Sequence, residues 1–160
     1  MGELDDYRER LLERLGKIVD ELAQAVNELP PEAWHKPISP HGQTLHYILA
    51  HLRNIEAQAL AVRLRRILDE DTPLLSLFDD EAWMASNYQA DEPVQVILDD
   101  YRHNRQEELS WLRSMPAIAW NRLARHPWWG VRTLQWWVEQ CHVYARQHLI
   151  DLTGCHPSRP

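Results

Sequence analysis

Histidine and tyrosine side chains interrupt apolar stripes at two distant points of the sequence. In the segment 133–152, every third or fourth residue is apolar except for Tyr144 and His148, which are one helical turn apart. His51 lies on a similar stripe in an earlier segment. A buried imidazole without a partner costs roughly 1–3 kcal/mol, so these rings require polar neighbours. The pattern predicts that His51, His148 and Tyr144 meet in the interior.

Four stretches with the apolar periodicity of amphipathic helices would have to position these rings. They span residues 4–29, 44–69, 91–115 and 133–152, with Thr44 as the expected N-cap of the second and residues 131–133 opening the fourth. Long structured connections are expected at 70–92, with a turn or two of helix at 79–86, and at 117–130. The sequence therefore predicts an all-α protein, an up-down-type four-helix bundle with two long structured loops.

Composition limits the class of protein. A chain of 160 residues with 44% hydrophobic and 26% charged residues is typical of one globular domain, expected at residues 1–155 with a short tail at 156–160. The net charge of −7 argues against nucleic-acid binding. There is no membrane-length apolar run and the first residues are charged, which predicts a cytoplasmic protein. Cys141 and Cys155 are expected to be reduced thiols.

Other polar and aromatic residues have two interpretations each. Arg105 interrupts the third apolar stripe and either pairs with Glu108 or faces a cavity beside the histidines. Trp83 and Trp137, among eight tryptophans in the chain, either pack in the core or line a substrate pocket with Arg105. Both readings stay open.

Three further polar side chains are excluded from the predicted cluster by helix geometry. His46 and Glu56 lie five residues from His51, roughly 140° around the helix, and are expected at the surface or the rim. His142 lies about 120° from the face of His148 and is expected near Glu139, one turn back.

Three motifs resemble a known superfamily. They are LAHLRNIE in the second helical stretch, DDYRHNRQEELSWL in the third, and HPWWGVRTLQWWVEQCHVYARQHLIDL at the end. With them the whole chain resembles the DinB-like (YfiT-like) superfamily of small four-helix bundles, which includes bacillithiol and mycothiol S-transferase-like proteins and maleylpyruvate isomerase-like proteins. The resemblance implies that His51 and His148 occupy two of three metal-ligand positions, for Zn, Ni or Fe. Tyr144 occupies the third position, where the family has histidine.

Two functions of different classes follow from this resemblance. The first is a divalent-metal-dependent transferase or hydrolase acting on a small molecule, with thiol S-transfer as the activity that the resemblance implies. The second is a metal-free or non-catalytic bundle in which the Tyr and His cluster binds a small ligand, because Tyr144 is a poor substitute for an imidazole. The expected partners are a small-molecule substrate, which the resemblance implies to be a low-molecular-weight thiol, and a second copy of the chain in a homodimer.

Overall fold

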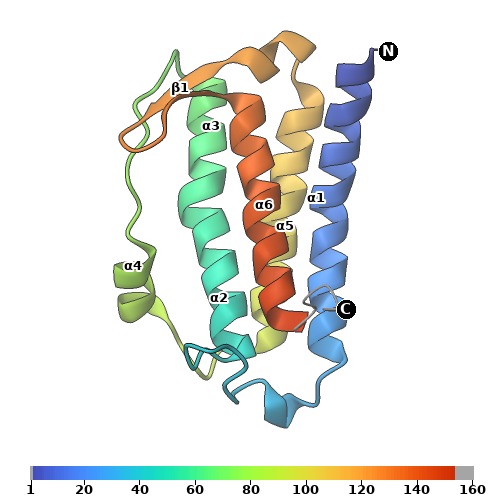
Figure 1. The fold of residues 1–160 in the computed structure, drawn as a ribbon, viewed down its shortest axis with the longest axis vertical. Helices are drawn as coiled ribbons and strands as arrows, with labels where there is room; N and C mark the ends of the chain where they lie inside the picture. Colours follow the sequence, from blue (N-terminus) through green and yellow to red (C-terminus); the bar gives the residue numbers. More distant parts are fainter. Residues whose placement is uncertain (1, 154–160) are drawn as a thin grey trace, which may run out of the picture.

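The computed structural model describes residues 2–153, and over this range four long helical segments form a bundle (Figure 1). The bundle is built from α1 (Glu3–Asn27), α2 and α3 (Leu45–Ile55 and Ala61–Asp69), α5 (Val94–Ser114) and α6 (Leu134–Thr153). One π-helical turn, Glu56–Leu60, joins α2 and α3 into a single rod. The predicted four-helix bundle is confirmed. The expected tail at 156–160 lies outside the described residues.

Local sequence explains where these helices begin and end. Pro30 and Pro31 stop α1, because proline lacks an amide donor and disfavours a helical residue before it. As predicted, Thr44 caps α2, and its hydroxyl accepts a hydrogen bond from the amide of Tyr47 at 3.1 Å. Thr133 does the same for α6 by accepting from the amide of Trp136 at 3.2 Å. No described helix is long and apolar enough to span a lipid bilayer.

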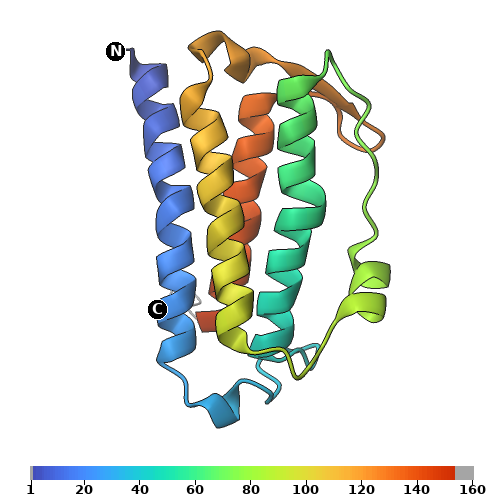
Figure 2. The same cartoon turned by 180° about the vertical axis from the view of Figure 1, so that it is seen from behind.

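The connection 70–93 runs back along the outside of the bundle, so that α5 is parallel to α2 and α3 (Figures 1 and 2). It contains the predicted short helix, α4 (Asp80–Asn87), which Asp79 caps through the amide of Ala82 at 2.9 Å. This path leaves the connection beside α2 and α3. It thereby brings the acidic start of α4 toward the bundle.

A β-hairpin precedes α6, and the expectation that residues 131–133 open that helix was wrong. Strands β1 (Leu123–His126) and β2 (Gly130–Thr133) pair antiparallel, and Gly130 has a positive φ of 66° at the turn. The backbone of Arg125 also exchanges hydrogen bonds of 2.8 Å with Leu75 and Pro73 in the connection 70–93. The hairpin and the connection therefore hold each other against the bundle.

The core consists of apolar stripes from all four helical segments. Leu22, Leu45 and Ile97 have no exposed surface, and neither do Leu134 and Val138 of α6. The predicted stripes are less complete at their ends and edges, because Leu4, Tyr7 and Val62 are 50%, 37% and 46% exposed. Cys141 is a buried free thiol, as expected, while Cys155 lies outside the described residues.

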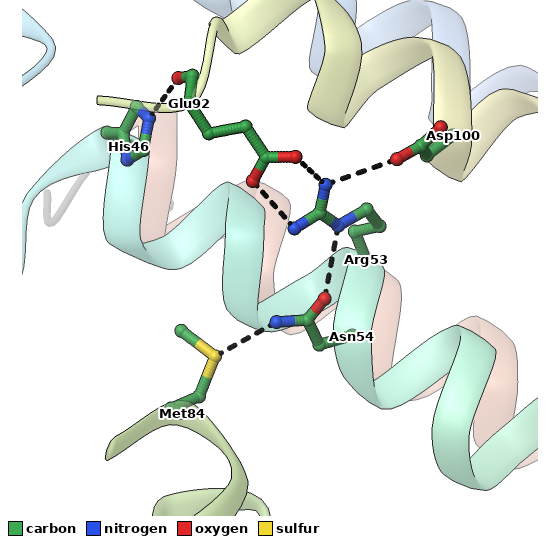
Figure 3. A network of polar contacts seen from close by, with 6 residues as sticks. All are labelled: His46, Arg53, Asn54, Met84, Glu92 and Asp100. Atoms are coloured by element: carbon green, nitrogen blue, oxygen red, sulfur yellow. Dashed lines mark hydrogen bonds and ion pairs between the residues drawn. The ribbon is translucent and has the colours of Figure 1, made fainter. Parts of the chain in front are cut away.

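A half-buried ion-pair network ties α2 to the start of α5 (Figure 3). The guanidinium of Arg53 donates to both carboxylate oxygens of Glu92, at 2.6 and 2.9 Å, and to Asp100 at 3.2 Å. The hydrogen bond from Arg53 is the largest cause that lowers the pKa of Glu92. A bidentate pair of this kind fixes orientation as well as distance. It therefore sets α2, and with it His51, relative to α5.

We expect Glu92→Gln to lower the free energy of unfolding by about 1–2 kcal/mol at pH 7, because the charge-assisted bidentate contact is lost. A carboxyl group whose pKa is lowered by folding stabilises the native state at pH values above its pKa in the unfolded chain. This contribution disappears as the pH falls through its pKa in the folded state. The difference between wild type and variant should therefore shrink below about pH 4. Urea denaturation at pH 7 and pH 3 measures it. Asp100→Asn, at the exposed partner, is the control and should change little.

Candidate functional site

His51 of α2 and His148 of α6 meet across the bundle, and we call them the histidine pair. His51 Nδ1 and His148 Nε2 are 3.4 Å apart, and the ring centroids are 5.3 Å apart. The other nitrogen of each ring bonds an oxygen: His51 Nε2 lies 2.7 Å from Asp80 Oδ2, and His148 Nδ1 lies 2.9 Å from the carbonyl oxygen of Tyr144. The structure thus brings together rings that are 97 residues apart in the chain.

These partners determine where the ring protons are. A carbonyl or carboxylate oxygen only accepts a hydrogen bond, so neutral rings carry their protons on His51 Nε2 and His148 Nδ1. Burial lowers the pKa of His148, which favours its neutral form at pH 7. The two remaining nitrogens then present lone pairs to each other at 3.4 Å. Two acceptors at this distance need a cation between them, either a proton or a metal ion.

The donor arrangement fits part of a metal site. Two nitrogen ligands on a tetrahedral zinc ion, each at about 2.0–2.1 Å, are about 3.3–3.4 Å apart. Histidine ligands usually donate their second N–H to a carboxylate or a backbone carbonyl, as His51 and His148 do here. Within residues 2–153, however, no group of three His, Cys, Asp or Glu side chains could hold a metal ion. The pair supplies two protein ligands, and a third must be of another type.

Tyr144 is the residue beside the pair that could complete such a set. Its ring centroid lies 4.5 Å from that of His148 and 6.4 Å from that of His51. Burial raises the pKa of the Tyr144 phenol, and the nearby carboxylates of Asp80 and Glu56 add to the shift. The phenol is therefore neutral at pH 7 in the absence of a bound cation. In that form it is a hydrogen-bond donor rather than an anionic ligand.

A cavity of about 280 Å³ adjoins the histidine pair, and we call it the aromatic cavity. Its walls come from α2 and α3, the connection before α4, the hairpin and α6. The lining residues are Ile55, Ala59, Leu60, Arg63, Leu77, Phe78, Asp80, His126, Trp128, Trp129, Trp137, Gln140, Val143 and Tyr144. Asp80 and Tyr144 contact the histidines and also line the cavity, so one end of the cavity borders the pair.

The three residues expected around a substrate pocket occupy different places. Trp137 lines the aromatic cavity and is almost completely buried. Trp83 packs against Phe78, with ring centroids 5.9 Å apart, and is not part of the cavity wall. Arg105 is buried in the bundle, away from this cavity, where its Nε donates to Glu108 at 3.1 Å. For Arg105, the pairing alternative is the one observed.

The expectation that His46 and Glu56 lie at the surface or the rim was wrong, because both are fully buried. The segment 28–44 and the connection 70–93 cover His46: the ring of His35 stacks on it, its Nε2 donates to the carbonyl oxygen of Glu92 at 2.7 Å, and its Nδ1 accepts from the Tyr88 hydroxyl at 2.8 Å. Glu56 opens the π-helical turn and accepts from Arg105 at 2.9 Å. Periodicity within one helix does not show what a distant segment will cover.

Sequence reasoning missed Asp80, Arg63 and His126. Asp80 bonds His51, and the other two line the aromatic cavity. The acidic cluster 79–81 and the HPWWG motif stood out in the sequence, but which helix each would meet depends on the paths of the two connections. No local signal identified Arg63.

The fold and the histidine pair define the class of this protein: a four-helix bundle with an incomplete histidine site between its second and last helical segments. Residues 10–149 match the mycothiol-S-transferase family, and the chain belongs to that family. The resemblance to DinB-like and YfiT-like proteins is thereby confirmed. Among curated proteins, no match was found.

Among solved structures that share the fold is YfiT from Bacillus subtilis, described as a probable metal-dependent hydrolase with an unusual four-helix bundle topology. The two structures superpose with a TM-score of 0.83 at 18% sequence identity, over 96% of this chain and 87% of that chain. At this identity the likeness establishes a common architecture.

Arg105 is the centre of a second buried polar cluster, separate from the histidine pair. Its guanidinium donates to Glu56, Glu108, the hydroxyl of Tyr101 at 2.8 Å and the carbonyl oxygen of Leu15 at 2.8 Å. Burial and the neighbouring Glu56 raise the pKa of Glu108 well above its usual range. One carboxylate oxygen of each glutamate has no partner among the described residues. A proton on Glu108 supplies the donor that these two oxygens lack.

We expect Glu108→Gln to be tolerated at pH 7, with a loss of less than about 1 kcal/mol, because glutamine keeps the shape and donor of a protonated carboxyl group. A raised folded-state pKa means that the native state binds a proton that the unfolded state releases above 4.5. Because of this proton, the free energy of unfolding of the wild type should fall as the pH rises from 5 toward 8. Glu108→Gln should remove that fall. Urea denaturation across this range tests it.

Arg105→Leu should instead lower the free energy of unfolding by about 3–5 kcal/mol, because it removes the cation from between two buried glutamates. Arg102→Leu on the same helix is the matched control, since Arg102 pairs with Asp20 at the exposed surface. Equal losses for the two variants would contradict the assignment of Arg105 as the buried counter-charge.

Proposed function

We propose that this chain is a divalent-metal-dependent enzyme that transfers or hydrolyses a small molecule, with the metal held by His51 and His148. The observation that carries the proposal is that one nitrogen of each ring faces the other ring at 3.4 Å. The second nitrogen of each ring is hydrogen-bonded to an oxygen. Neutral imidazoles in this orientation are prepared to share one cation. Membership of the mycothiol-S-transferase family supports a transferase activity, and the description of YfiT as a probable metal-dependent hydrolase supports the metal.

The family name supports a more specific proposal, in which one substrate is a low-molecular-weight thiol. A bound divalent ion lowers the pKa of a coordinated thiol or water and so supplies a nucleophile at neutral pH. The protein side chains orient and shield that nucleophile. Asp80 holds the ring of His51, the carbonyl of Tyr144 holds the ring of His148, and the indoles of the aromatic cavity limit the access of water.

Tyr144 has two roles in this proposal. Where the metal is bound, its phenolate is the third protein ligand, although burial makes its deprotonation costly. In its neutral form, the phenol borders both the histidine pair and the aromatic cavity and donates a hydrogen bond to a substrate there.

A second candidate function is a metal-free small-ligand-binding bundle. It is favoured by one observation: residues 2–153 contain no third His, Cys, Asp or Glu that could complete a metal site at the pair. In this case the shared cation is a proton. His51 is then an imidazolium that pairs with Asp80 and donates to His148 Nε2.

Metal analysis of protein purified without a polyhistidine tag separates the two functions. We expect about one equivalent of zinc or nickel after soaking, together with a rise in Tm, because a ligand that binds only the native state stabilises it. His51→Ala should abolish both effects. Tyr144→His should raise the metal affinity by about tenfold or more, since it completes a three-imidazole set.

His103→Ala is the matched control, because this histidine is exposed on α5 and lies beside Glu107. It should leave the metal content unchanged. Less than about a tenth of an equivalent in the wild type, with no change on soaking, would remove the enzyme proposal and leave the metal-free binding module.

A further inference from the structure

Three side chains that line the aromatic cavity carry hydrogen-bond donors for which residues 2–153 provide no acceptor, apart from one long contact of Arg63. They are the guanidinium of Arg63 from α3, the imidazole of His126 from β1 and the indole of Trp137 from α6. The centroids of the His126 and Trp137 rings are 5.5 Å apart, and the guanidinium carbon of Arg63 lies 5.4 Å from the centroid of Trp137. Side chains from three separate elements therefore surround one part of the cavity.

Arg63 is a half-buried cation for which the described residues provide no carboxylate partner. Its one hydrogen bond is a long contact of 3.5 Å to the carbonyl oxygen of Ser76, and its guanidinium lies over the rings of Trp129 and Trp137. Burial lowers the pKa of Arg63. The neighbouring Arg65 and Arg66 pair with Asp69 and Glu70 on the same helix. Arg63 alone of these three directs its charge to the cavity.

His126 presents an N–H group that no described residue accepts. Its Nδ1 accepts from the backbone amides of Trp128 and Trp129, at 3.2 and 3.4 Å, so the proton of the neutral ring is on Nε2. The ring is 3% exposed, and its Nε2 has no partner within residues 2–153. Burial and the charge of Arg63 lower the pKa of His126 and keep the ring neutral.

Trp137 supplies the third donor. An indole N–H can only donate, and that of Trp137 is buried without a partner in the described part of the chain. A buried donor without an acceptor costs free energy, so two such groups beside an unpaired guanidinium indicate a missing acceptor. The side chains that carry these donors line the same cavity, and an oxyanion is the acceptor that suits them. Asp80, also in the cavity wall, is already bonded to His51.

The rim of the cavity is apolar and exposed. Leu77, Trp128, Trp129 and Val143 are 48%, 73%, 43% and 58% exposed, and all four line the cavity. Exposed indoles above buried donors suit a ligand with an apolar, flat body and an acidic head.

We propose that the aromatic cavity binds a small carboxylic acid with an aromatic or similarly apolar body. The carboxylate accepts from Arg63, His126 and Trp137, and the body lies between the indoles of Trp128 and Trp129. This assignment rests on the proposed function only in naming the ligand as the substrate. Binding itself requires no metal.

The probe is phenylacetate, titrated into the full chain after treatment with a chelator and followed by calorimetry and tryptophan fluorescence. Because the chelator removes any metal, phenylacetate binding is measured independently of the proposed metal site. A failure of the metal proposal would therefore not affect this test. We expect saturable binding with a Kd on the order of 1 mM or below. Phenylacetamide, which has the same shape without the charge, should bind at least about tenfold more weakly. Acetate, which has no apolar body, should also bind more weakly.

Two variants assign the head group. Arg63→Gln should weaken phenylacetate by about tenfold or more, whereas Arg65→Gln, two residues away on the same helix, should leave it unchanged. Trp137→Phe removes one donor but keeps an aromatic ring, and it should weaken phenylacetate several-fold even if Arg63→Gln does not fold. Circular dichroism and Tm establish that each variant is folded.

Three results would overturn the proposal. They are the absence of saturable phenylacetate binding up to about 10 mM, equal affinities for phenylacetate and phenylacetamide, and unchanged affinity in both folded variants. If inorganic sulfate bound as tightly as phenylacetate, the site would be one for simple anions, and the apolar rim would have no part in recognition.

Discussion

The site depends on two acceptor nitrogens that face each other across the bundle. Each ring is held by an oxygen that cannot donate, Asp80 Oδ2 for His51 and the Tyr144 carbonyl for His148, so neither ring can turn to offer its proton to the other. The 3.4 Å separation is thus stable only with a cation shared between them. Packing of α2 against α6 sets that distance, and the path of the connection 70–93 determines that a carboxylate stands behind His51.

Three buried or half-buried arginines of this bundle differ in their hydrogen-bond partners. Arg105 is surrounded by two glutamates, a hydroxyl and a carbonyl, and its cluster is complete once Glu108 holds a proton. Both terminal nitrogens of the Arg53 guanidinium donate to the carboxylate of Glu92. Arg63 has aromatic faces and one long hydrogen bond in place of carboxylates. Of these three arginines, Arg63 is the one for which residues 2–153 provide no carboxylate, and this difference is the basis for proposing a ligand at the aromatic cavity.

Much of the fold, and the centre of the site, could be predicted from the sequence. Apolar periodicity located the four helical segments, and the same stripes placed His51 and His148 on facing seams, because both properties depend only on local helix geometry. The burial of His46, the hairpin at 123–133 and the contact of Asp80 with His51 could not be predicted in this way. Each depends on where a long connection crosses the bundle, which is determined by tertiary packing rather than by a local pattern.

The π-helical turn Glu56–Leu60 links the separate polar environments of the molecule. Its first residue, Glu56, points to the buried cluster of Arg105, whereas Ala59 and Leu60 line the aromatic cavity. A π turn inserts extra rotation into a helix, and such turns occur frequently at functional sites. One rod can therefore present His51 to α6, Glu56 to α5 and Arg63 to the cavity, directions that a regular helix with a single inward stripe would not combine. The turn lies between His51 and Arg63 on one rod, so it sets the direction of the cavity-lining side chains of α3 relative to the histidine pair.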